Sequence, residues 1–209
     1  MGDVLLTAFV TFLVVIDPIG QAPLFGALTA GLDTRARRAV ALRGVLIAAI
    51  ILTAFALGGD IVLGALGIGF PAFRIAGGLL LVLLSIEMVM ARHSGLSATT
   101  PEESEEAAER SDVAVFPLAI PLIAGPGAIT GVMLQMGGAG DDLAAQAAVL
   151  GVMFGVLLLT LVSLLLTGPI MRLLGVTGTN VLTRVFGIIL AALGVQFVSD
   201  GVLAILAAA

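Results

Sequence analysis

The 209-residue sequence contains no cysteine, no lysine and only one histidine, and 11% of its residues are charged. Without cysteine the chain can form neither a disulfide nor a thiolate metal site. His93 lies in a polar stretch, so an apolar segment has no histidine for a catalytic dyad. No zinc-ligand, nucleophile-elbow or phosphate-loop spacing occurs, and a net charge of −5 leaves no basic patch for nucleic acid. We expect neither an enzyme nor a metal or cofactor site.

What the sequence does contain is apolar residues, at 60% of the chain, with a mean hydropathy of +1.23. Soluble domains usually carry about a quarter charged residues, and a helix that crosses the hydrocarbon core needs about 20 apolar residues. The pattern predicts an all-α membrane protein in one bundle. Six transmembrane helices are expected, at residues 4–29, 40–57, 75–90, 114–136, 143–167 and 185–208, with turns at 31–38, 58–71, 92–111, 137–142 and 168–180.

The arginines predict the orientation of these helices. Cytoplasmic loops are enriched in Lys and Arg, and eight of the nine arginines fall on one side if the N-terminus lies outside. Arg74 alone falls on the outer side. We expect a multi-pass protein of the plasma membrane with both termini outside the cytoplasm.

The two halves of the chain repeat two sequence features in the same order. Pro18 and Pro23 in the first helix match Pro121 and Pro126 in the fourth, and an Arg-x-x-Gly sequence opens the third and the sixth helices. Three helices per repeat reverse the direction of insertion, so the repeats are inverted, as in many secondary transporters. The predicted units are a first repeat at 1–91, an acidic cytoplasmic linker at 92–112 and a second repeat at 113–209. Gene duplication without a transport role is the alternative.

Prolines with neighbouring glycines predict that the first and fourth helices are broken. Proline removes a helical N–H and clashes with the preceding turn, and paired broken helices indicate a substrate site at the bilayer midplane. Half-helix N-termini can bind a carboxylate, and freed carbonyls an ammonium group. This chemistry fits a small zwitterion. The candidate substrate-binding residues are Asp17, Gly20, Gln21, Thr29, Gly125, Gly127 and Thr130. The alternative is a proline kink with glycines for close helix packing.

Asp17 is the ionisable residue expected deepest in the membrane, where such groups are usually functional. It is a candidate for coupling transport to protons. A structural role is also open, because Asp17 precedes Pro18 and can cap the second half-helix.

Four charged residues predict two ion pairs. Because the third and sixth helices run antiparallel, Arg74 comes level with Asp200 and Arg184 with Glu87. Such pairs could gate the two faces, whereas the alternative is anchoring of each side chain at the membrane surface.

Residues 15–25, 73–78, 117–130 and 184–187, with Val195 to Phe197, resemble the MarC family, also called the six-helix neutral amino acid transporter (NAAT) family. The resemblance covers nearly the whole chain. It implies a prokaryotic plasma-membrane protein that transports small neutral amino acids such as glycine or alanine, plausibly with protons. The family usually has asparagine where this chain has Gln21.

Two other interpretations stay open at this stage. The first is an exporter of another small polar solute, and the second is a membrane scaffold whose acidic linker binds a partner. A homo-oligomer is compatible with each of them.

Overall fold

The computed structural model describes residues 2–90 and 113–208, all of the secondary structure being helical within those two ranges. The elements are α1 (Gly2–Ile16), α2 (Gln21–Leu28), α3 (Thr34–Ala65), α4 (Phe70–Met90), η1 (Ala114–Ile123), α6 (Pro126–Ala139), α7 (Leu143–Leu165), α8 (Thr167–Leu173) and α9 (Gly175–Ala208). The predicted linker at 92–112, with His93, Arg92 and Arg110, lies outside the described residues.

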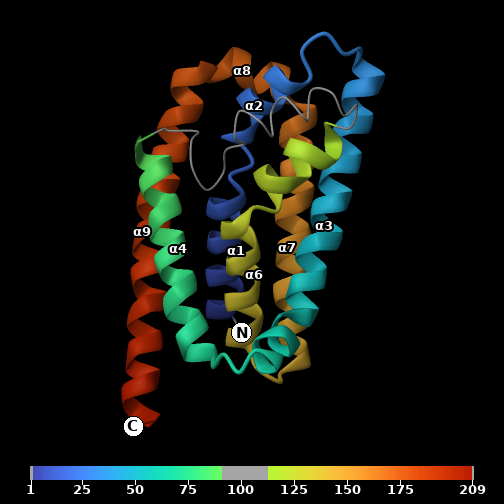
Figure 1. Ribbon diagram of the computed structural model, residues 1–209. Helices are drawn as coiled ribbons and strands as arrows, with labels where there is room; N and C mark the ends of the chain where they lie inside the picture. The colour runs from blue at the N-terminus through green and yellow to red at the C-terminus, as the bar shows by residue number, and fades with distance from the viewer. Residues whose placement is uncertain (1, 91–112, 209) are drawn as a thin grey trace.

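The helices form a bundle with α1 and α6 in the centre (Figure 1). The α4–α9 pair flanks them on one side and the α3–α7 pair on the other, while α2 and α8 lie together at one end. Five helices of the described part are long and apolar enough to cross a membrane, or six if the bent pair η1 and α6 is one span. At about 1.5 Å per residue, the 32 residues of α3 and the 34 of α9 exceed the ~30 Å hydrocarbon core.

The outer surface of the bundle is apolar. Ile61, Leu158, Ile188 and Leu203 are each more than 60% exposed. A soluble protein rarely exposes such extended apolar surface, whereas the same side chains are favourable against lipid tails. The surface therefore agrees with a multi-pass integral membrane protein.

Glycines hold α4 and α9 together at very short range. A Cβ at Gly78 would lie 2.6 Å from the Gly194 carbonyl oxygen, and one at Gly201 would lie 2.8 Å from the Pro71 carbonyl oxygen. These contacts pair residue 78 with 194 and 71 with 201, which confirms that the two helices run antiparallel. Glycine allows the backbones to approach closely, as is common between membrane helices.

Two of the predicted turns are wrong, because α3 continues through Gly58 and Gly59 to Ala65, and residues 168–180 form α8 and the start of α9. A glycine costs a helix only about 1 kcal/mol relative to alanine, and packing offsets this cost. Gly59, for example, lies against Met133, whose Cε would be 3.0 Å from an added Cβ. α3 also begins earlier than the predicted residue 40: its first residue is Thr34, and Asp33 caps this end by accepting a hydrogen bond from Ala36 N at 2.7 Å.

Candidate functional site at two helix interruptions

The first helix is interrupted at residues 17–20, as the sequence predicts. Asp17 has a φ of 45°, a left-handed conformation that Asp tolerates better than most residues. Its backbone N–H still bonds to Leu13 O at 3.1 Å, but Pro18 has no N–H to continue the helix. Hydrogen bonding resumes when Gln21 N donates to Asp17 O at 3.1 Å. The interruption is thus short, and α2 follows immediately.

The Asp17 side chain is buried, with 8% of its surface exposed. One carboxylate oxygen accepts from Gly20 N at 3.0 Å, which is the capping role expected for the start of α2. The other accepts from the Thr183 hydroxyl of α9 at 2.6 Å. Gly20 allows this arrangement, because an added Cβ would lie 2.0 Å from Asp17 Oδ2 and 2.4 Å from Thr183 Oγ1, and these side chains would have to shift.

The second interruption affects more residues than predicted. The sequence predicts a helix over 114–136, and this prediction is wrong for the first ten residues, Ala114–Ile123. Phe116 (φ −135°, ψ 128°) and Ile120 (φ −127°, ψ 128°) are extended, so η1 is not a regular helix. Each precedes a proline, Pro117 or Pro121, and proline disfavours the helical conformation of the residue before it. The axes of η1 and α6 meet at 55°. Both X-Pro bonds are cis.

Gly125 lies at the bend, immediately before the first residue of α6, Pro126. A Cβ at Gly125 would lie 2.3 Å from the Pro121 carbonyl oxygen, so only glycine fits there. Proline is favoured at the first position of a helix, where its missing N–H is not needed. No side chain caps this end of α6.

Gln21 joins the two interruptions. Its side-chain Nε2 donates to the Ile16 carbonyl and, at 3.2 Å, to the Leu122 carbonyl, three residues before Gly125. Both neighbours of Nε2 are carbonyl oxygens, which accept from the amide NH2 group and leave Oε1 on the other side of the amide. We call residues 17–21 and 122–128 the junction.

The junction contains polar groups without a hydrogen-bond partner among the described residues. Its one such side-chain atom is the Oε1 acceptor of Gln21, a residue that is 95% buried. In the backbone, the N–H groups of Gly127 and Ala128 lie in the first turn of α6, where a helix leaves its N–H groups without intrahelical partners. A buried polar group without a partner typically costs about 1–3 kcal/mol. The junction thus offers a side-chain acceptor and, at the positive end of a helix dipole, backbone donors.

The other predicted binding residues lie away from these groups or have packing roles. Thr29 is buried at the C-terminal end of α2, where its hydroxyl donates to Phe25 O at 2.7 Å. The methyl group of Thr130 packs on Gly77 of α4. A Cβ at Gly127 would lie 2.5 Å from Leu84 Cδ2, so this glycine also allows α6 to pack closely.

The charged residues on α4 and α9 lie near the heights along the helix pair that the sequence predicts. The pairing of 78 with 194 and of 71 with 201 puts Arg74 level with residue 198, within a turn of Asp200. No ion pair joins these two residues in the described structure. The Arg74 guanidinium lies 5.3 Å from the Phe70 ring centroid, and Asp200 accepts from Gln196 Nε2 at 2.7 Å. By the same pairing Glu87 and Arg184 also come near one level, and the gating role of all four stays a prediction.

Sequence reasoning missed two hydroxyl groups that hold the first interruption and one buried polar pair. Besides Thr183, the Ser163 hydroxyl of α7 donates to the Pro18 carbonyl at 2.6 Å. Gln135 Nε2 of α6 donates to the Thr11 hydroxyl of α1 at 2.9 Å, and both residues are buried. The available signal was a polar residue within an apolar helix, which commonly bonds to a neighbouring helix.

No group of three or more His, Cys, Asp or Glu residues able to hold a metal ion occurs within residues 2–90 and 113–208. The polar groups of the junction are amide and carboxylate groups, which suit an organic solute with its own donors and acceptors.

Comparison with known proteins shows that this chain is similar to membrane proteins. Residues 2–206 match the model of a family described as MarC family integral membrane proteins. A UPF0056 membrane protein of Methanocaldococcus jannaschii is 37% identical over 93% of this chain and 94% of its own length. UPF0056 membrane proteins of Bacillus subtilis (YvbG) and Escherichia coli (YhcE) are 33% and 34% identical, covering 96% and 93% of this chain and 95% and 89% of their own lengths. No solved structure matches the chain.

Proposed function

Since this chain belongs to the MarC family of integral membrane proteins, we propose that it is a secondary transporter of small neutral amino acids of the size of glycine or alanine. The observation that carries this proposal is the junction, where two helix interruptions from different halves of the chain meet through Gln21. Polar backbone at membrane depth is tolerated only where it contacts protein or lines a polar cavity. Paired interruptions of this kind are typical of substrate sites in secondary transporters.

The unpartnered groups of the junction match the two charged ends of a zwitterion. The N–H groups of Gly127 and Ala128 are suited to a carboxylate, because the helix dipole adds to their hydrogen bonds. Gln21 Oε1 is suited to an ammonium group, and the Asp17 carboxylate supplies a compensating negative charge one helix turn away. Gly20, Gly125 and Gly127 are all tightly surrounded, which favours a small substrate over a bulky one.

Two inverted three-helix repeats, giving six spans, would bring two interrupted helices together at the junction. Each half has one interruption, between α1 and α2 and between η1 and α6, and a proline lies in the first turn of the helix that follows it. The antiparallel packing of α4 and α9 also supports inverted repeats. In such an architecture one repeat rocks against the other, so that the junction opens alternately to the two sides. Asp17 is the candidate for proton coupling. No cofactor and no catalytic step are needed.

Arginine placement supports a cytoplasmic position for the end that carries α2 and α8. Arg35, Arg37 and Arg38 begin α3 at that end, and Arg172 is in α8. Both chain termini lie toward the other end (Figure 1), which would be outside the cytoplasm. The plasma membrane of a prokaryote is the matching location, and a homo-oligomer is compatible with it.

Uptake of radiolabelled glycine and alanine into proteoliposomes tests the proposed function. We expect saturable uptake by the wild-type protein and a loss of at least tenfold in the Asp17→Asn and Gly125→Leu variants. Asp60→Asn is the matched control, because Asp60 is an exposed carboxylate on α3. Uptake that is absent in the wild type, or unchanged in both junction variants, contradicts the proposal. Flux in everted vesicles then gives the direction of transport.

A further inference from the structure

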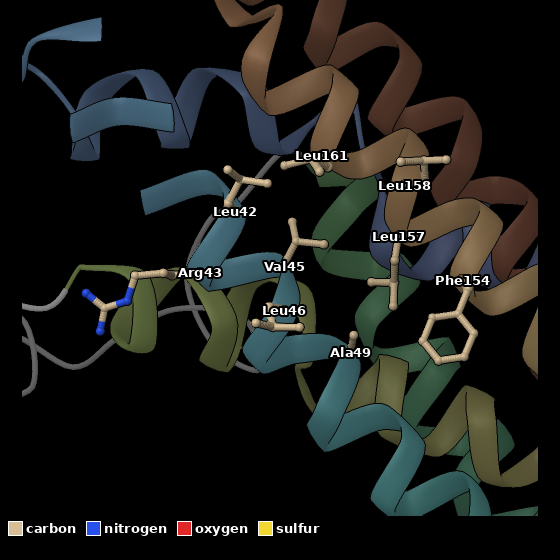
Figure 2. A pocket seen from close by; sticks show the side chains of 9 residues that line it. All are labelled: Leu42, Arg43, Val45, Leu46, Ala49, Phe154, Leu157, Leu158 and Leu161. Carbon is tan, nitrogen blue, oxygen red and sulfur yellow. The ribbon is translucent and has the colours of Figure 1, made fainter. Parts of the chain in front are cut away.

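An apolar groove runs along the outer surface between α3 and α7 (Figure 2). Its volume is about 440 Å³, and it is lined by Leu42, Arg43, Val45, Leu46, Ala49, Phe154, Leu157, Leu158 and Leu161. Leu46 and Leu158 are each 61% exposed, so the groove is open to the surroundings of the bundle. Eight of its nine lining residues are apolar and the ninth is Arg43, so the lining favours a hydrocarbon chain over a polar solute.

Beyond the end of the groove at Leu42, the same face of α3 carries two arginines. With 3.6 residues per turn, Arg35 and Arg38 lie on the same face of α3 as Leu42, Leu46 and Ala49. Arg38 lies about 6 Å beyond Leu42 along the helix at about 1.5 Å per residue. Both arginines are exposed, and neither makes a hydrogen bond or ion pair within the described residues.

Arg43 is not part of this basic end. Its guanidinium extends away from the apolar side chains in Figure 2, and it has interactions of its own. Arg37 points to the opposite face of α3, where its guanidinium lies 5.4 Å from the Phe25 ring centroid.

We propose that this groove binds one anionic glycerophospholipid, with an acyl chain along α3 and α7 and its phosphate at Arg35 and Arg38. The phosphate of such a lipid binds cationic donors, and its acyl chain binds an apolar surface. This face of α3 has the two arginines at its end and the apolar groove directly after them. Of the seven arginines in the described ranges, Arg35, Arg37, Arg38 and Arg172 lie at this end. With the orientation proposed above, this end meets the cytoplasmic leaflet, where anionic lipids attract basic residues.

Charge also distinguishes the lipid from a second copy of the chain. Two copies in one membrane share one orientation, so a two-fold interface on this face would set Arg35 and Arg38 of each copy at the same height as those of the other. Like charges placed together repel. A phosphate placed there is attracted instead.

Lipid titration of the purified protein, followed by native mass spectrometry, tests the assignment. The probes are 1-palmitoyl-2-oleoyl-phosphatidylglycerol and the matching phosphatidylcholine. We expect tighter binding of one phosphatidylglycerol than of phosphatidylcholine by the wild type. Because both arginines attract the lipid phosphate, the Arg35→Gln/Arg38→Gln variant should bind phosphatidylglycerol about 30-fold more weakly.

Two further variants separate the groove from general surface charge. Arg172→Gln removes an exposed arginine from α8 at the same end, and we expect it to keep the tight binding. Ala49→Phe fills the groove and should reduce binding of both lipids to this site. Equal binding of the two lipids by the wild type overturns the proposal, as does an equal loss in Arg172→Gln. A dimer that disappears in Ala49→Phe, with no bound lipid, assigns the face to a second copy instead.

Discussion

Replacing Gly20 with alanine should damage the first interruption selectively. The new Cβ would lie 2.0 Å from Asp17 Oδ2 and 2.4 Å from Thr183 Oγ1, distances that real side chains do not show. The carboxylate must move, and it then loses the hydrogen bond from Gly20 N, the one from Thr183, or both. A hydrogen bond to a charged group contributes about 1.5–3 kcal/mol, while Gly→Ala gains about 0.4–1 kcal/mol through the unfolded chain. If one of these bonds is lost, the net cost is about 0.5–2.6 kcal/mol.

Gly26→Ala is the matched control, in the helix that follows Gly20. Its Cβ would meet the Thr167 methyl group at 3.4 Å, an ordinary contact, so we expect no loss and up to about 1 kcal/mol of gain. The assay is the free energy of unfolding from reversible titration with dodecyl sulfate in mixed micelles. In a Thr183→Ala background the cost of Gly20→Ala should fall, because one of the two clashing atoms is gone. Equal stabilities of the Gly20→Ala and Gly26→Ala proteins would refute the reasoning.

Three more substitutions test the packing and the polar contacts by the same unfolding assay. Thr183→Val keeps the shape of the side chain but removes the hydroxyl donor to the Asp17 carboxylate, so it should lower the free energy of unfolding by about 1–3 kcal/mol. The control Thr177→Val, at an exposed position of α9, should change it little. Gly194→Leu places a side chain within 2.8 Å of α4 backbone and should cost about 1–3 kcal/mol or more. Gly64→Leu, which meets nothing within 4 Å, should not destabilise. Gln135→Leu breaks a buried interhelical hydrogen bond and should cost about 0.6–2 kcal/mol; no change in its stability would show that this bond contributes nothing.

The positions of the interruptions could be predicted because their cause is local. Proline lacks an N–H wherever it stands, so Pro18 and Pro126 mark the breaks without knowledge of any neighbour. The same local reasoning accounts for the extended residues Phe116 and Ile120, which precede prolines, and it should have predicted an irregular η1.

The partners of the interruptions could not be predicted in this way. Thr183 and Ser163 reach residues 17 and 18 from α9 and α7, across 166 and 145 positions of sequence. Which face of a lipid-covered helix turns inward depends on its rotation, and nearly uniform apolar helices carry little periodic signal for that rotation. The continuation of α3 through Gly58 and Gly59 could not be predicted for the same reason: packing against other helices outweighed the low helix propensity of glycine.

The most direct test of the account is equilibrium binding of glycine to the purified wild-type and Gln21→Leu proteins, measured beside ethylamine and acetate. Gln21 supplies the unpartnered acceptor and links the two interruptions. The account predicts saturable binding of glycine, much weaker binding of either single-charge analogue, and a loss of at least tenfold in glycine affinity in the variant. Glycine binding of equal strength in both proteins, or none in the wild type, would contradict it.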